Sequence, residues 1–268
     1  STVRQIRAGV PQGSILGPIL FNMFMHDLPI PAHSTLALFA DDTALISQHQ
    51  DIDTAVDMLQ TDTDLLLDWF VNWKIALNPL KCEAKIFSLR KFNPLRNIEI
   101  QDNIIPWNEN DRTVKYLGVL LDSKLTYKQH INSKLNQANT RLAQMYPIIN
   151  RRSSLKLKCA LLIYQGIFRP LLTYACPVWG PCLHKSKMNK LQVFQNKFLR
   201  IATNSPWFVR NRQIHNELEI PTICDYIRKL SATFLETLDQ STGAVHFNIG
   251  QRTVNRRLKA RLVQDILL

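Results

Sequence analysis

The chain has 268 residues, 46% of them hydrophobic, with 33 Lys and Arg against 21 Asp and Glu. This composition excludes a wholly disordered chain, and no apolar run reaches the about 20 residues that a membrane-spanning helix needs. The cysteines are odd in number and form no C-x-x-C pair, which indicates reduced thiols of a cytoplasmic or nuclear protein, not a disulfide framework or a zinc site.

The first fifty residues predict a helix followed by a β-hairpin. After a turn-rich start, an apolar helix is expected over Ile19–Leu28. Two apolar runs follow, Thr35–Ala40 and Thr43–Gln48, and only Asp41 and Asp42 separate them. This arrangement predicts a hairpin with two aspartates at its tip.

A long amphipathic helix and several short strands are predicted next. Asp51 has the side chain of an N-cap, and apolar residues recur at three to four positions over Ile52–Trp73, with a polar gap near the middle. Short strands are expected over Ala84–Leu89, Asn97–Ile100 and Val114–Leu121.

From Tyr127 the pattern becomes helical. Prolines separate four expected helices, Tyr127–Tyr146, Ser154–Phe168, Lys185–Thr203 and Thr222–Leu238. Beyond Leu238 the apolar periodicity fades, so a loose tail is expected. The order of elements predicts an α+β chain, in which a unit of β-hairpins and helices precedes an all-helical one.

Charge is distributed unevenly along the chain. Residues 1–80 carry three basic and nine acidic side chains, a net charge of −6, whereas residues 81–268 carry 30 basic and 12 acidic ones, a net charge of +18. Between Asp122 and Glu217 there are 16 Lys and Arg and no Asp or Glu. A one-sided stretch of this length indicates a polyanionic partner, although a solvated basic surface without a partner is the alternative.

The two aspartates of the predicted hairpin are the first candidates for chemistry. Adjacent carboxylates repel each other, and a bound cation is the obvious compensation. Four apolar neighbours are expected to be buried: Leu38, Phe39, Leu45 and Ile46. Carboxylate oxygens with few other protein ligands suit Mg²⁺, which also takes phosphate oxygens of a substrate. Taken alone, such a pair is more often a structural turn than a metal site.

Four segments favour a metal site over a structural turn, because together they resemble the motifs of reverse transcriptases and follow each other in the same order. Ala8–Ser14 resembles the motif after the first catalytic strand, and Phe39–Asp42 resembles the Tyr/Phe-x-Asp-Asp hairpin. Leu77–Lys81 is similar to the next motif, and Lys115–Gly118 is similar to the primer-grip hairpin. Further on, Pro206–Asn211 resembles the region after the primer grip in jockey-like elements. The chain is therefore identified as similar to the C-terminal part of a non-LTR retrotransposon reverse transcriptase.

The resemblance implies a division of the chain. Residues 1–91 would be a partial polymerase palm, 92–122 a primer-grip-like hairpin, 123–240 a basic helical thumb or connection region, and 241–268 a loose basic tail. It implies an RNA-directed DNA polymerase that transfers nucleotides to a primer 3′-OH with two Mg²⁺ (or Mn²⁺) ions. RNA template, DNA primer and deoxynucleoside triphosphates would be its partners, with no membrane. In the family a further catalytic aspartate and the fingers lie upstream, so we expect this chain, taken as a fragment, to be inactive alone.

The resemblance also assigns roles to residues. Asp41 and Asp42 would bind the metal, and Lys81 would act on the departing pyrophosphate. The nucleotide- and template-binding positions would be Pro11, Gln12, Gly13, Ser14, Phe39 and Ala40. The primer-grip positions would be Tyr116, Leu117 and Gly118. The cations expected to contact the nucleic-acid backbone are Lys124, Lys128, Lys134, Arg141, Arg151, Arg152, Lys156 and Lys158. The Trp and Phe residues near these cations are expected in the core and not as platforms for bases.

Two other functions remain open at this point. The chain could be a non-catalytic RNA- or DNA-binding remnant of a decayed element, or a helical adaptor whose basic face binds an acidic protein. The pair Asp41 and Asp42 argues against a pure binding module, which has no use for paired acids on an apolar hairpin. The adaptor leaves the first 121 residues unexplained.

Overall fold

The computed structural model describes residues 13–90, 94–108, 112–150 and 152–240. The chain divides into two compact units, an N-terminal unit, Ser1–Arg112, and a C-terminal unit, Thr113–Leu268. The expected primer-grip segment 92–122 is therefore split between them. Pro11, Gln12, Arg151 and the expected tail lie outside the described residues. Within the described ranges, every helix is too short or too polar to cross a membrane.

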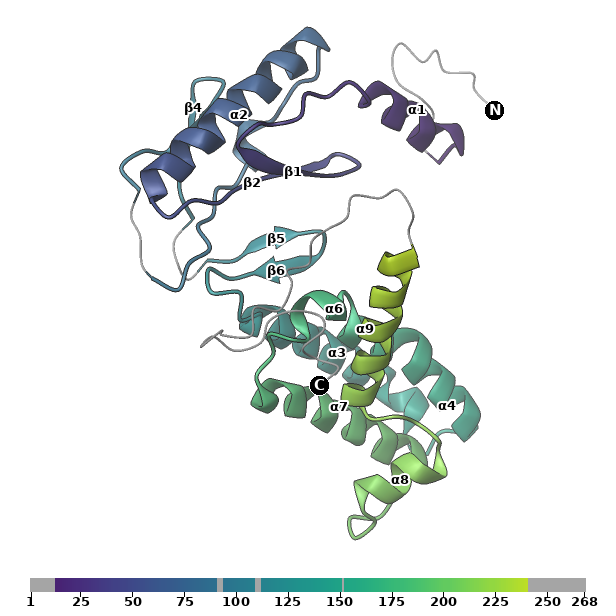
Figure 1. Cartoon of the computed structure of the whole chain (residues 1–268). Helices are drawn as coiled ribbons and strands as arrows, with labels where there is room; N and C mark the ends of the chain where they lie inside the picture. The colour runs from purple at the N-terminus through teal and green to yellow at the C-terminus, as the bar shows by residue number, and fades with distance from the viewer. Residues whose placement is uncertain (1–12, 91–93, 109–111, 151, 241–268) are drawn as a thin grey trace. The chain divides into compact units, whose positions relative to one another are not determined.

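The N-terminal unit consists of helices and two short hairpins (Figure 1). Its elements are α1 (Leu16–Phe24), β1 (Ser34–Phe39), β2 (Asp42–Ser47), α2 (Ile52–Asn72), β3 (Ile98–Ile100) and β4 (Asn103–Ile105). β1 pairs with β2 and β3 pairs with β4, both antiparallel. The predicted hairpin and the predicted long helix are confirmed. Asp51 caps α2 as expected, because its carboxylate accepts a hydrogen bond of 2.9 Å from the Thr54 amide.

The predicted strand over Ala84–Leu89 is wrong. Only Ala84 pairs with another strand-like residue, in an isolated parallel bridge to Trp107. The side chains of Phe87 and Leu89 are exposed. A sequence with β propensity forms a strand only where a neighbouring strand provides backbone hydrogen bonds along its length. Here the pairing is limited to the single bridge between Ala84 and Trp107.

Two small clusters form the core of this unit, and α2 contributes to both. Near its start, Val56 packs with Ile98 and Ile105 of the β3–β4 hairpin. Near its end, Leu66, Trp69 and Phe70 pack with Leu28 and with half-buried residues of β1 and β2. Helix α1 buries none of its residues among those described. One face of α2 thus provides most of what holds the β1–β2 hairpin.

The C-terminal unit opens with a hairpin and is otherwise helical. Its elements are β5 (Val114–Tyr116), β6 (Val119–Leu121), α3 (Lys128–Ile149), α4 (Leu157–Ile163), α5 (Arg169–Thr173), α6 (Cys176–Trp179), α7 (Lys185–Thr203), α8 (Asn211–Glu217) and α9 (Ile223–Gln240). The four predicted helices are present, with shifted ends. α4 continues through a π-helical turn, Tyr164–Phe168, into α5, and α3 runs past Pro147.

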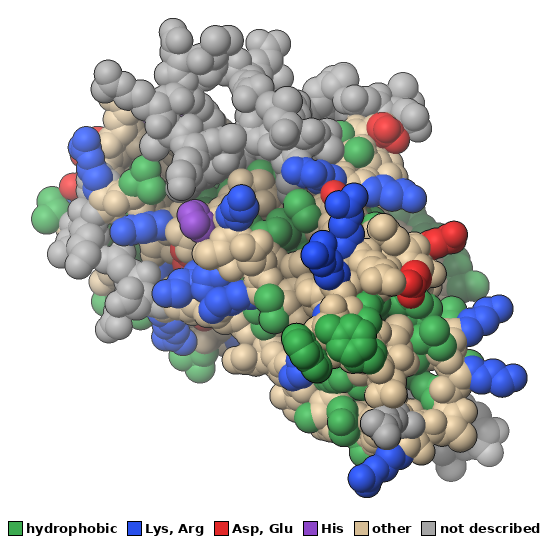
Figure 2. Space-filling model, turned by 90° about the horizontal axis from the view of Figure 1, so that it is seen from below, with side chains coloured by type: hydrophobic (Ala, Val, Ile, Leu, Met, Phe, Trp, Pro, Cys, Tyr) green, Lys and Arg blue, Asp and Glu red, His purple; other side chains and the backbone are tan. Residues whose placement is uncertain are grey.

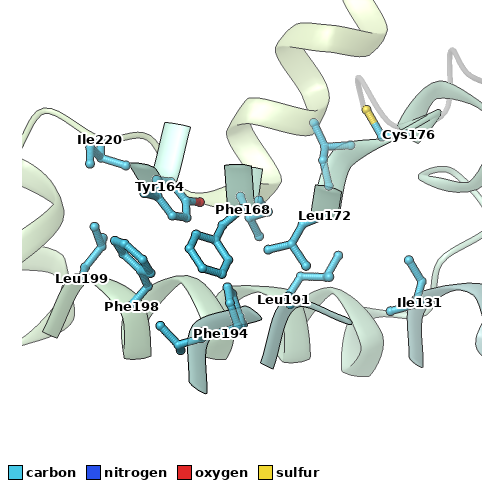
Figure 3. Close-up of a cluster of buried hydrophobic side chains, with 14 of the residues drawn as sticks. Ile131, Tyr164, Phe168, Leu172, Cys176, Leu191, Phe194, Phe198, Leu199 and Ile220 are labelled. Atoms are coloured by element: carbon cyan, nitrogen blue, oxygen red, sulfur yellow. The ribbon is translucent and has the colours of Figure 1, made fainter. Parts of the chain in front are cut away.

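An aromatic core holds these helices together. In Figure 3, Tyr164 and Phe168 lie opposite Phe194 and Phe198 of α7. Phe168 is fully buried, and its ring centroid lies 5.0 Å from that of Phe198 and 5.7 Å from that of Phe194. Such ring pairs add to the free energy gained from burying apolar area. The core extends to α3 through Ile131 and to α9 through Ile223 and Ile227, so α3 is held rigidly along its inner face.

Candidate functional site

The two aspartates lie at the turn of the β1–β2 hairpin. Phe39 pairs with Asp42, which leaves Ala40 and Asp41 as the two residues of the turn. Ala40 has φ 52°, a left-handed conformation that a tight hairpin requires and that glycine adopts more easily. Asp41 therefore lies in the turn itself, and Asp42 is the first residue of β2. Both side chains are exposed.

The expectation that the apolar neighbours of this pair are buried is wrong for three of the four. Leu38, Phe39 and Ile46 are 44%, 64% and 57% exposed, whereas Leu45 is half-buried. The pleat of the sheet turns alternate side chains to opposite faces, which places Phe39 and Ile46 on the face opposite Leu36 and Leu45. Leu38 shares the face of Leu36 but lies beside the turn, where it is exposed. Leu36 and Leu45 pack against α2, and the other face meets no described part of the N-terminal unit.

Within the described ranges, no cation neutralises Asp41 or Asp42. Among the described residues, neither carboxylate takes part in a hydrogen bond or an ion pair, and no three acidic, histidine or cysteine side chains come together as a ready metal site. Two adjacent, accessible carboxylates fit a hard divalent cation such as Mg²⁺ or Mn²⁺ that completes its shell with water and phosphate oxygens. The donor set therefore suits the expected metal, with room for substrate ligands.

A third aspartate positions the hairpin, and sequence reasoning missed it. Asp62 of α2 is 1% exposed and accepts hydrogen bonds from the Ala32 and His33 amides, each 3.1 Å long, and from the Ser34 hydroxyl. It thereby fixes the chain where it enters β1. Burial alone would raise the pKa of the Asp62 carboxyl, but these donors outweigh it and hold the pKa below its usual value of 3.8. The signal was the polar gap in the apolar stripe of α2, which contains Asp62 and Thr63.

Of the other positions expected at the nucleotide site, Gly13, Ser14 and Lys81 are described, and they lie on short turns of the same unit. Lys81 is exposed at the end of a 3-10 turn, Pro79–Lys81, whose start is capped by the Asn78 side chain. Gly13 has φ 83° and open space around it, and the Ser14 hydroxyl accepts a 3.0 Å hydrogen bond from the Gly17 amide at the start of α1. No ion pair joins Lys81 to either hairpin aspartate in the described part of the chain.

The hairpin expected as a primer grip belongs to the C-terminal unit. Leu117 and Gly118 form its turn with φ 45° and 79°, the two positive values of a type I′ hairpin. The Tyr174 hydroxyl donates a 2.7 Å hydrogen bond to the Leu117 carbonyl. A Cβ at position 118 would lie 3.2 Å from the Tyr174 ring, so glycine permits this close approach. Tyr116 is half-buried on β5. Tyr174 thus braces the turn against the helices.

The expected backbone-binding cations are mostly exposed. Exposed members are Lys124, Lys128, Arg141, Arg152, Lys156 and Lys158. Lys134 differs, because its ammonium lies 5.1 Å from the centre of the Tyr174 ring. Partial burial, and then the nearby Lys115 and Arg141, lower the pKa of Lys134. Figure 2 shows a face on which Lys and Arg side chains recur while Asp and Glu side chains are few.

A groove along α3 was not predicted. It has a volume of about 700 Å³ and is lined by Leu120 of β6 and by one polar stripe of the helix. The stripe consists of Gln129, Asn132, Ser133, Asn136, Gln137, Thr140, Arg141 and Gln144. Arg141 is its one charged member, so the groove offers amide and hydroxyl groups beside a cation. The expected nucleic-acid contacts were all Lys and Arg, whereas this stripe consists mainly of amide and hydroxyl side chains. Their helical spacing can nevertheless be read from the sequence.

Comparisons with known proteins show which family the chain resembles. The family model described as "Reverse transcriptase (RNA-dependent DNA polymerase)" matches residues 2–121. "Probable RNA-directed DNA polymerase from transposon X-element" of Drosophila melanogaster is 32% identical over 272 residues, which cover 100% of this chain and 29% of the relative. "RNA-directed DNA polymerase from mobile element jockey" of Drosophila funebris is 34% identical over 287 residues, covering 100% of this chain and 30% of the relative.

These relatives confirm the family resemblance, including its extension beyond residue 121. The chain spans about 30% of the length of the curated relatives that it matches. No solved structure gives a significant match to it.

Proposed function

Residues 2–121 belong to the reverse transcriptase family, and on that premise we propose that the chain is part of an RNA-directed DNA polymerase of a non-LTR retrotransposon. The observation that carries the proposal is the pair Asp41 and Asp42, presented at a hairpin turn where no cation of the described residues forms an ion pair with it. The N-terminal unit would supply part of the polymerase palm. The C-terminal unit would act as the thumb that holds the template and primer.

At the hairpin, Asp41 would be the main metal ligand and Asp42 the second. The bound ions would activate the primer hydroxyl and stabilise charge on the triphosphate. Lys81 would stabilise or protonate the pyrophosphate as it leaves, from its exposed place after the 3-10 turn. The exposed Phe39 ring and the open space at Gly13 suit contacts with the incoming nucleotide and the template base. Asp62 would keep the hairpin in place.

In the C-terminal unit, the β5–β6 turn would contact the primer, and its support by Tyr174 would fix where Tyr116, Leu117 and Gly118 lie. The α3 groove would follow the RNA–DNA hybrid, because amides and hydroxyls bind sugar and phosphate oxygens and Arg141 neutralises a phosphate. The exposed lysines at the start of α3 and on α4 would add binding that weakens with salt.

The proposal includes that this chain alone does not extend a primer. Two metal ions between a primer hydroxyl and a triphosphate need more carboxylate ligands than one turn provides. Asp41 and Asp42 are neighbours on the same turn, so they approach a metal pair from one side. A further carboxylate from elsewhere in a complete polymerase would close the site.

A chimera tests the polymerase assignment. The chain replaces the aligned segment of the X-element relative, and extension of a DNA primer on an RNA template is measured with Mg²⁺. We expect extension that Asp41→Asn abolishes, and that Lys81→Ala slows by about 10² to 10⁴-fold if Lys81 is the general acid. Asp68→Asn, an exposed acid on α2 away from the hairpin, is the matched control. Extension that survives Asp41→Asn would overturn the assignment of the metal ligand, whereas a folded chimera that extends no primer would favour the non-catalytic binding remnant.

A further inference from the structure

Two large aromatic side chains protrude from the loop between α7 and α8. Trp207 is 89% exposed and Phe208 is 68% exposed, and their ring centroids lie 6.0 Å apart at an interplanar angle of 82°. The expectation that aromatic residues near the basic positions belong to the core is therefore wrong for this pair. Figure 1 shows the loop projecting from the end of the C-terminal unit, beside α8.

The loop that carries the pair is held firmly. Arg200 of α7 donates hydrogen bonds to the Pro206 carbonyl (3.1 Å), to the Val209 carbonyl and to the Asn211 side chain (2.8 Å). One guanidinium thus ties both ends of the loop to the helix before it. Apolar rings that are exposed on a braced loop are already ordered, so a ligand that covers them does not have to pay for ordering the backbone.

The surroundings of the pair are cationic. Arg210 and Arg212 flank the loop and are exposed, and neither forms an ion pair with a described residue. A hollow of about 530 Å³ adjoins the loop's anchor, with Arg200 and Asn211 in its wall together with Lys197 and Tyr146. The preceding stretch, back to Asp122, contains no Asp or Glu. Aromatic rings among unpaired cations match a ligand that has both flat apolar faces and negative charge.

From these observations we propose that Trp207 and Phe208 form a stacking site for an unpaired nucleic-acid strand. Bases within a duplex already stack on each other, whereas the bases of a single strand can leave the stack and lie on an aromatic ring. Arg210, Arg212 and Lys197 would neutralise the phosphates of the same strand. The inference goes beyond the proposed function, because it concerns a strand outside the hybrid, and it does not depend on the α3 groove.

Affinity measurements on the full chain test this proposal. A fluorescein-labelled single-stranded RNA, the DNA of the same sequence and an RNA–DNA hybrid are titrated in parallel. We expect Trp207→Ala and Phe208→Ala each to weaken binding of the single strand by about 5-fold or more and to leave hybrid affinity unchanged. Phe234→Ala, which removes another exposed ring of the C-terminal unit, is the matched control and is expected to have no effect. Comparing the RNA and DNA arms shows which unpaired strand the site prefers.

Substitution of Trp207 by an aromatic or by an aliphatic residue distinguishes stacking from simple apolar contact. Trp207→Phe keeps an aromatic face and is expected to retain most of the affinity, whereas Trp207→Leu is expected to lose it. Equal affinity of Trp207→Leu and Trp207→Phe, or unchanged single-strand binding in the variant lacking both rings, overturns the proposal. If variants of Trp207 and Phe208 keep their affinity for single-stranded RNA but lose binding to a protein partner, the proposal is also overturned and the two rings are assigned to protein docking. Because both rings are exposed, each variant should keep the thermal midpoint of the unaltered chain.

Arg141→Ala keeps this test independent of the proposed function. That change is expected to weaken hybrid binding and to spare the single strand. If the chain binds the single strand through Trp207 but does not bind the hybrid, the proposed grip fails and the stacking site stands. If it binds the hybrid but not the single strand, the stacking proposal is overturned and the grip stands.

Discussion

The two units of this chain bury their side chains in different ways. In the C-terminal unit, one continuous core joins α3, α4, α5, α7 and α9 around fully buried aromatic rings. In the N-terminal unit, two small clusters lie along α2, α1 buries nothing, and the outer face of the β1–β2 hairpin is open. The comparison teaches that the basic surface of the C-terminal unit is backed by a continuous core, whereas the acidic hairpin depends on a few specific contacts.

The charges of the two units follow the same division. The acidic residues before position 80 include Asp41 and Asp42, which form no ion pair with a described residue. Between Asp122 and Glu217, every Asp, Glu, Lys or Arg position is Lys or Arg. A metal site requires uncompensated carboxylates, and a nucleic-acid grip requires uncompensated cations. Each unit therefore keeps the charge that its proposed ligand would neutralise.

The largest effect is expected from opening the aromatic core. Phe168→Ala removes a fully buried ring that packs on Phe194 and Phe198, and we expect the free energy of unfolding of the C-terminal unit to fall by about 3–5 kcal/mol. Urea denaturation followed by circular dichroism measures the loss. Phe39→Ala, which removes a 64% exposed ring from the N-terminal unit, is the control, with an expected change within about 0.5 kcal/mol. Similar losses for both variants would remove the contrast between the units.

Acid should weaken the C-terminal unit first. His130 is buried under the β5–β6 hairpin, where its Nδ1 accepts a 3.3 Å hydrogen bond from the Leu120 amide. Burial, and then the charge of Lys134, lower the pKa of His130 from 6.5 to about 4. The unfolded chain therefore takes up a proton before the folded chain does. Stability should be full above pH 6.5 and fall by about 2–3 kcal/mol as the pH drops toward 4.

Denaturation at several pH values, with His130→Gln for comparison, measures this dependence. The variant is expected to lose most of the change between pH 6.5 and 4. The N-terminal unit should respond only at lower pH, because the pKa of Asp62 lies below 3.8 and its hydrogen bonds are lost when it is protonated. If the stability of the C-terminal unit stayed constant between pH 6.5 and 4, the conclusion that buried His130 is neutral would be wrong.

The hairpin's dependence on one carboxylate is tested by Asp62→Asn. The amide group cannot accept all the hydrogen bonds that the Ala32 and His33 amides and the Ser34 hydroxyl donate. We expect the N-terminal unit to lose about 1–3 kcal/mol, and hydrogen exchange at the start of β1 to accelerate. Asp68→Asn, on the exposed side of the same helix, should change neither. Unaltered exchange in Asp62→Asn would show that α2 packing alone holds the hairpin.

The smallest effect concerns the brace on the second hairpin. Tyr174→Phe keeps the ring beside Gly118 and removes the hydrogen bond to the Leu117 carbonyl, with an expected loss of about 0.5–1.5 kcal/mol. Tyr146→Phe, at a half-exposed tyrosine whose hydroxyl forms no hydrogen bond with a described residue, is the control. Equal stability of the two variants would mean that the β5–β6 turn holds its shape without Tyr174.

The sequence predicted the elements whose signals are local. The Asp51 cap and the three-to-four residue spacing predict α2, the helical pattern between prolines predicts α7, and two aspartates between apolar runs predict the β1–β2 hairpin. The elements that were predicted wrongly or missed depend on tertiary contacts or are very short. The strand expected over Ala84–Leu89 lacks a partner, and α6 and α8 are too short to show a period. Whether an apolar residue is buried also depends on which face finds a neighbour, as the exposed Phe39 demonstrates.

Parts of the candidate site show the same limit. The motif residues could be identified in the chain, but a sequence does not reveal which side chain anchors another. Asp62 looks like any polar residue on a helix until Ala32, His33 and Ser34 are seen to donate to it. Trp207 and Phe208 look like core residues until the loop that Arg200 holds presents them to solvent.

The central claim is that the basic unit binds nucleic acid and the acidic hairpin binds metal. The most direct test measures binding of the purified chain to a labelled RNA–DNA hybrid over a salt series, with and without Mg²⁺. The account predicts binding at low salt that weakens steeply as salt rises, because phosphate contacts release counterions. Arg141→Ala should weaken that binding and reduce its salt dependence, while Asp41→Asn should leave the affinity without Mg²⁺ unchanged. Absence of binding at low salt, or affinity that Arg141→Ala leaves intact and Asp41→Asn destroys, would contradict the account.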